Sequence, residues 1–151
     1  MSTPFRSKLR FSALGLFLPG TGLNCFYLLG IKSFWGWIQL TSLIAGILGF
    51  LLLNTSPESS AAAWVLIVLG FIALEASWLS TIVFGLRPDE KWDAQFNASF
   101  QGKQKTESGW PVVICVILSL VIGAGAMMSF LAIGFEQFFI YQIEEAKKLS
   151  Q

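Results

Sequence analysis

Long apolar blocks with almost no charge constrain this chain more than any other feature. Residues 34–53 contain no Asp, Glu, Lys or Arg, and residues 61–86 and 110–140 contain one charged residue each. Because an α-helix rises 1.5 Å per residue, about 20 apolar residues cross a bilayer core. Charged residues make up only 13% of the chain, too few to cover a soluble domain. The sequence therefore predicts an all-α integral membrane protein.

We expect four transmembrane helices packed as a bundle. Their ranges are 9–29, 34–53, 61–86 and 110–140, separated by a short turn at 54–60 and a polar loop at 87–109, and followed by a polar tail at 141–151. Proline removes a backbone donor and glycine loosens the backbone, so the first helix is expected to break at Pro19-Gly20. Little sequence is left over for a soluble domain.

Several function classes are excluded by what the composition lacks. The chain has no histidine, the commonest general base and metal ligand. Its two cysteines, Cys25 and Cys115, lie far apart inside apolar blocks and are expected to be small buried hydrophobes. A net charge of +1 gives no basic footprint for nucleic acid. We expect no enzymatic activity, no metal and no cofactor.

A glycine-rich and aromatic signature occupies the first two segments, ALGLFLPGTGLNCFYLLGIKSFWGWIQL. Gly20 and Gly22 form a glycine break, Asn24, Phe26 and Tyr27 a polar-aromatic run ending at Gly30, and Gly36 opens the next apolar stretch. Over residues 7–53 this pattern resembles the TM-two family, a membrane domain of two helices. In this chain Asn24-Cys25 replaces the His-Arg or Asp-Arg of most members. The resemblance implies a helical hairpin in a bacterial inner membrane, in a family mostly without a defined activity.

The glycines have a physical interpretation that does not depend on the resemblance. Small residues let membrane helices approach closely, so Gly20, Gly22, Gly30 and Gly36 are expected to pack the first two helices together. A discontinuous helix that holds an ion or substrate is the alternative.

The Lys and Arg residues do not decide the orientation. With four crossings they divide five against five; a re-entrant first segment, leaving three crossings, divides them eight against two. The charge favours three crossings, whereas the length of segment 9–29 and the resemblance favour four. We expect four crossings with a cytoplasmic N-terminus.

Three aromatic residues recur at helical spacing in the polar loop. Trp92, Phe96 and Phe100 stand at positions i, i+4 and i+8 of a short amphipathic stretch. They predict a stripe that lies on the bilayer interface or on a partner, and a solvated loop is the alternative.

Glu75 lies near the middle of an apolar segment, where an ionised carboxylate is costly and protonation lowers that cost. Ala73, Ser77 and Ser80 occupy roughly the opposite helix face, and small residues mark close helix contact. Both faces therefore favour protein over lipid. Because a small four-helix monomer does not easily enclose one helix on two sides, the pattern favours a homo-oligomer or a larger complex.

These observations favour a non-enzymatic accessory or structural subunit of a membrane-protein assembly, with the lipid bilayer and other membrane subunits, or further copies, as its partners. The alternative is a small proton-coupled transporter that acts as a homo-oligomer through Glu75.

Overall fold

A computed structural model describes residues 4–55, 60–100, 102 and 104–149 of the chain. The fold is all-helical, with α1 (Lys8–Phe17), α2 (Leu23–Leu29), α3 (Phe34–Thr55), α4 (Ser60–Gly85), α5 (Asp89–Phe96) and α6 (Trp110–Leu149). Three of these helices, α3, α4 and α6, are long and apolar enough to cross a membrane. The expected integral membrane class is therefore supported, with three candidate spans rather than four.

The first apolar segment does not form a single helix. It divides into α1, which has ten residues, and α2, which has seven, so the two extend only about 15 and 10 Å. The expected four-helix transmembrane bundle is not confirmed. The chain reverses direction between the two short helices. The Arg6 guanidinium donates to the Tyr27 carbonyl oxygen at 2.7 Å and holds α2 beside the segment that leads into α1.

Local chemistry at residues 18–22 explains this reversal. Leu18 has left the helical region because it precedes Pro19. Gly20 and Gly22 have φ angles of +75° and +72°, which L side chains rarely adopt. The Thr21 hydroxyl donates to the Leu18 carbonyl oxygen at 2.7 Å and completes the last turn of α1. The break expected at Pro19-Gly20 is thus a turn between two helices.

The helices α3 and α4 form the most extensively packed pair of the fold, an antiparallel hairpin. Their backbones approach most closely where a Cβ on Gly46 would lie 2.6 Å from the Gly70 Cα atom. The turn expected at 54–60 begins within the end of α3, and residues 56–59 lie outside the described part of the chain.

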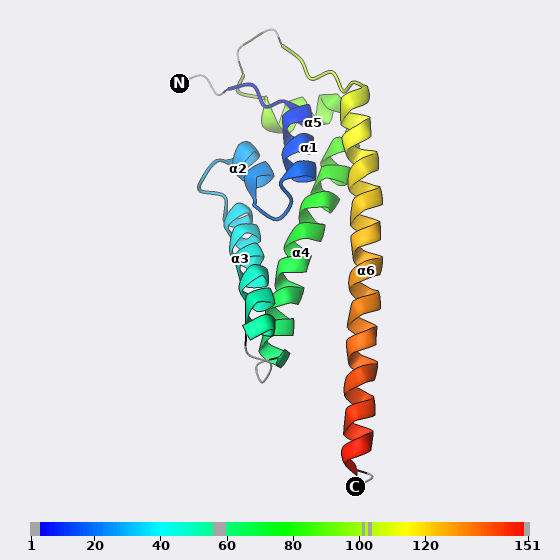
Figure 1. Ribbon diagram of the computed structural model, residues 1–151. Helices are drawn as coiled ribbons and strands as arrows, with labels where there is room; N and C mark the ends of the chain where they lie inside the picture. The colour runs from blue at the N-terminus through cyan, green and yellow to red at the C-terminus, as the bar shows by residue number, and fades with distance from the viewer. Residues whose placement is uncertain (1–3, 56–59, 101, 103, 150–151) are drawn as a thin grey trace.

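The last helix runs along α4 and α1 and then continues past the ends of α3 and α4 (Figure 1). The sequence predicted a helix over 110–140 followed by a polar tail, but α6 extends without a break to Leu149. Residues 144–149 read Glu-Glu-Ala-Lys-Lys-Leu, all good helix formers, so nothing ends the helix at Ile140.

A compact cap closes the end of the molecule where the N-terminal segment, α5 and the beginning of α6 meet (Figure 1). Lys8, only 3% exposed, pairs with Asp89 at 2.9 Å and also donates to Ser108 Oγ and to the Arg87 carbonyl oxygen. Because Lys8 contacts both ends of the loop 87–109, it ties that loop to the beginning of α1.

Candidate functional site

The strongest candidate site is a groove between α4 and α6, which we call the Glu75 groove. Glu75 follows the beginning of α4 by 15 residues and precedes its end by 10, so it lies about 22 and 15 Å from the two helix ends. A cavity of about 230 Å³ adjoins it. Its lining residues are Glu75, Trp78, Leu79, Ile82, Ser119, Leu120, Gly123, Ala124 and Met127.

Two buried polar atoms in this groove have no hydrogen-bond partner among the described residues. They are Oε1 of Glu75 and Oγ of Ser119, and Ser119 is fully buried. An unsatisfied buried polar group costs about 1–3 kcal/mol, and a charged one costs more. A site that supplies a donor to both atoms would recover this free energy. The groove is therefore chemically incomplete within this chain.

The remaining lining fixes which groups can enter the groove. Trp78, Leu79 and Ile82 from α4 face Leu120 and Met127 from α6 and give the groove apolar walls. Gly123 makes room for the carboxylate, because a Cβ there would lie 3.3 Å from Oε2 of Glu75. Apolar walls around one carboxylate favour a ligand that is itself mostly apolar and carries a single polar or cationic group.

The small residues on the other side of α4 contact α1 and α2. Ala73 and Ser77 are buried, and the Ser77 hydroxyl donates to the Gly15 carbonyl oxygen of α1 at 3.4 Å. Ser80 accepts a hydrogen bond from the Asn24 amide of α2 at 2.8 Å. The chain itself thus covers this face, and α3 and α6 also pack on α4. On the Glu75 side of α4, Leu79 stays 60% exposed, so this chain encloses the helix on two sides only in part, and the oligomer stays a prediction.

The four glycines predicted to pack helices have different surroundings. A Cβ on Gly22 would collide with the Gly36 carbonyl group, and one on Gly36 would lie 2.5 Å from the Phe26 ring. Gly20 packs on Leu74 of α4. Gly30 differs from the other three, because nothing lies within 4 Å of its Cβ position. It follows the last residue of α2 and has a φ of +79°, which lets the chain leave the helix. Gly30 therefore serves the turn and not helix packing.

The polar-aromatic signature forms contacts between elements. Asn24 is buried and bonds Ser80 as described, whereas the Phe26 ring lies 5.4 Å from the Trp37 ring. The Tyr27 hydroxyl oxygen accepts a hydrogen bond from the Ser7 amide at 2.8 Å. These contacts hold α2 against α4, α3 and the N-terminal segment.

The aromatic residues predicted as an interfacial stripe instead divide between two places. Trp92 is fully buried against Phe11 and lies 4.7 Å from Phe96, ring centre to ring centre. Phe100 lies beyond the end of α5 and packs on Phe5, 5.4 Å away. The predicted stripe is wrong, because α5 is only eight residues long and turns its aromatic face toward α1 and α4.

The carboxylates of the cap are held in their charged form. Burial alone would raise the pKa of Asp89, but hydrogen bonds from Ser108 and Lys8 and the charge of Lys8 together lower it below its ordinary value. Burial also acts to raise the pKa of Asp93, as does the nearby charge of Asp89. Hydrogen bonds from Thr106 and Asn97 outweigh both effects, so the pKa of Asp93 is lowered as well. These contacts give the cap a structural role in joining the N-terminus to the loop.

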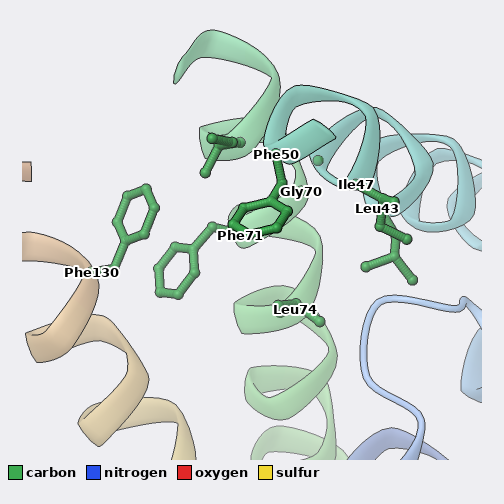
Figure 2. A pocket seen from close by; sticks show the side chains of 9 residues that line it. Leu43, Ile47, Phe50, Gly70, Phe71, Leu74 and Phe130 are labelled. Atoms are coloured by element: carbon green, nitrogen blue, oxygen red, sulfur yellow. The ribbon is translucent and has the colours of Figure 1, made fainter. Parts of the chain in front are cut away.

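A second cavity, of about 280 Å³, lies between α3, α4 and α6 (Figure 2). Leu43, Ile47 and Phe50 of α3 line one side, and the rings of Phe71 and Phe130 stack at 4.1 Å on the other. Gly70 of α4 also lines this cavity (Figure 2). Its residues offer contacts to apolar groups only.

Sequence reasoning missed the glycines that set the α3–α4 crossing, Gly46, Gly49 and Gly70. A Cβ on Gly49 would lie 2.7 Å from the Ala63 carbonyl oxygen. The signal was present, since Ser42 and Gly46, and Ala45 and Gly49, are pairs of small residues four apart, a spacing typical of close helix contact in membranes.

Comparison of the sequence with protein-family models, and of the chain with curated proteins and solved structures, gives no match. The resemblance to the TM-two family therefore stays a prediction.

Proposed function

We propose that this chain is a non-enzymatic accessory subunit of a larger membrane-protein assembly, which it joins through the C-terminal part of α6. The observation that carries the proposal is the exposure of this part. From Leu131 to Leu149 every side-chain-bearing residue of α6 is exposed. We call residues 135–149 the α6 extension.

The length of α6 supports a binding role outside the bilayer core. Forty residues extend about 60 Å, against a hydrocarbon core of about 30 Å and a full bilayer of 40–45 Å. The first turn of α6 is anchored at the cap, because the Ser108 amide donates to Asp89 just before it. The excess length therefore belongs to the C-terminal end, which we place on the opposite side of the membrane.

The α6 extension is amphipathic. Phe135, Phe139 and Ile143, at positions i, i+4 and i+8, are 61%, 62% and 55% exposed. Gln137, Glu144 and Lys148 occupy the opposite face. Burying an apolar side chain of this size contributes roughly 1.5–3 kcal/mol, so this face favours an apolar environment over water, and we propose that a protein partner provides it.

Charge supports one orientation for this arrangement. We propose three crossings with a re-entrant α1–α2 hairpin, a cytoplasmic N-terminus and cap, and, following the resemblance, a bacterial inner membrane. The cap end then carries eight of the ten basic residues, Arg6, Lys8, Arg10, Lys32, Arg87, Lys91, Lys103 and Lys105. The other end carries Lys147 and Lys148. This asymmetry agrees with the positive-inside rule.

The test compares two triple variants by their assembly size in native membranes solubilised in mild detergent. Phe135→Ser, Phe139→Ser and Ile143→Ser together remove the apolar face; Gln137→Ser, Glu144→Ser and Lys148→Ser make a matched set on the opposite face. We expect the first set to release the chain from its assembly and the second to leave it bound. Retention of the full assembly by the first set would contradict the proposal.

A second candidate function, proton-coupled transport by a homo-oligomer, is favoured by the unpaired Oε1 of Glu75. The apolar walls of the groove argue against this candidate, because a transported proton must reach the carboxylate through water or polar groups. Two differently tagged copies that co-purify alone, together with a proton-dependent flux that Glu75→Gln abolishes, would favour this candidate over the first.

A further inference from the structure

Among the described residues, the helices that line the Glu75 groove offer it no counter-ion. The helices α3 and α4 contain no Lys, Arg or His, and the first basic residue in α6 is Lys147. Acidic residues inside membranes usually pair with another polar group or face water. Because the groove walls are apolar, a pairing group has to be brought by another molecule.

We infer that the Glu75 groove binds a transmembrane helix of another protein that carries a cationic side chain at its middle. This inference rests on the proposed accessory function and names the kind of partner. In such a complex the carboxylate of Glu75 is the counter-ion.

The depth of Glu75 argues for a helix over a lipid. The carboxylate lies about 15 Å along α4 from the nearer helix end, farther than a lipid headgroup reaches below the interface. A transmembrane helix, by contrast, places a side chain at any depth. It also covers the apolar walls of the groove, Trp78, Leu79 and Leu120, with apolar side chains of its own.

A second copy of this chain does not fit the groove. At the depth of the groove its spanning helices would bring another Glu75 and no cation, and two carboxylates in apolar surroundings repel each other. A different protein is therefore required. The small residues Gly123 and Ala124 on the α6 side of the groove permit the close backbone approach that helix pairs in membranes use.

The experiment measures binding of a defined peptide to the full-length protein in phosphatidylcholine vesicles. The peptide is a Leu/Ala helix of about 20 residues, labelled with a fluorescence acceptor, with Lys, Leu or Glu at its centre; the protein carries the donor. We expect the Lys peptide to bind roughly tenfold more tightly than the Leu peptide, the size of one strong polar contact between membrane helices. The Glu peptide should bind no better than the Leu peptide.

Two variants assign the preference to the groove. Glu75→Gln should remove most of the preference for Lys, whereas the same change at the exposed Glu136 of α6 should leave it intact. Equal binding of the Lys and Leu peptides by the wild-type protein would overturn the inference, as would a preference for Lys that persists in Glu75→Gln. Equally tight binding of the Glu peptide would show that the groove does not select cations and would also overturn it.

These outcomes are separate from those that test the accessory function. If the wild-type protein shows no preference for the Lys peptide but its assembly still depends on Phe135, Phe139 and Ile143, only the inference about the groove is contradicted. An assembly that is unchanged when those three residues are replaced would contradict the proposed function, regardless of the peptide-binding result. Binding of the lipophilic cation tetraphenylphosphonium at Glu75, with no preference for the Lys peptide, would overturn the inference in favour of transport.

Discussion

Replacing Trp92 by alanine is expected to destabilise the protein by about 3–5 kcal/mol, the usual cost of deleting a large buried aromatic side chain. Trp92 is fully buried, and its ring lies 5.6 Å from that of Phe11 and 4.7 Å from that of Phe96. The cost therefore comes from the cavity among these rings. The lost hydrogen bond to Arg6 is the smaller contribution, about 1 kcal/mol, because the Arg6 carbonyl oxygen still accepts from Asn97 at 3.3 Å.

The conservative variant separates these two contributions. Trp92→Phe keeps most of the ring packing and loses the bond from the indole nitrogen to Arg6, which is worth about 1 kcal/mol. Trp35 offers a matched control, since its side chain is 66% exposed and Trp35→Ala should change stability by less than about 0.5 kcal/mol.

The assay is the free energy of unfolding of the purified protein in mild detergent, measured by titration with sodium dodecyl sulfate and followed by far-ultraviolet circular dichroism. We expect the order of stability to be wild type and Trp35→Ala, then Trp92→Phe, then Trp92→Ala. A Trp92→Ala protein as stable as Trp35→Ala would refute the reasoning and would return Trp92 to the bilayer surface.

Three further predictions follow from individual contacts. Gly46→Ala places a methyl group against the α4 backbone and should loosen the α3–α4 hairpin, whereas Gly125→Ala meets open space and should stabilise α6 by about 0.8–1 kcal/mol, both measured by detergent unfolding. Gly22→Ala combines a positive φ with a collision and should lower the yield of folded protein more than Gly125→Ala does, as judged by size-exclusion chromatography. The pKa of Asp89 is lower in the folded protein, so its stabilising effect is complete above the unfolded value of about 3.9 and is lost as the pH falls through the folded pKa. Asp89→Asn should therefore flatten the acid limb of the stability curve, and an unchanged acid limb would contradict the ion pair with Lys8.

The three spanning helices could be predicted from the sequence because hydropathy and length alone determine them. The predicted range 34–53 corresponds to α3 (Phe34–Thr55), and the predicted range 61–86 corresponds to α4 (Ser60–Gly85). The first segment could not be predicted in this way. Its length and its apolar residues suggest a spanning helix, whereas its fold depends on two positive φ angles and on a bond from Arg6 to Tyr27, 21 residues away.

The candidate site was only partly visible in the sequence. Glu75 is conspicuous because it is a lone acid in an apolar block. Its neighbours Ser119 and Gly123 could not be assigned to it, because they lie on α6 and reach the groove through the register of two helices distant in the chain. The aromatic spacing of Trp92 and Phe96 was recognised correctly, but spacing alone does not reveal whether such a face turns toward lipid or toward the protein.

The most direct test of the three-crossing architecture is the side of the membrane from which single cysteines react with an impermeant maleimide. Pro4→Cys, Glu107→Cys and Glu145→Cys place thiols at exposed positions before α1, before α6 and in the α6 extension, in a chain whose Cys25 and Cys115 are replaced by serine. We predict that positions 4 and 107 react from the cytoplasmic side and position 145 from the opposite side. Reaction of positions 4 and 145 from one side and of position 107 from the other, as four crossings require, would contradict this account.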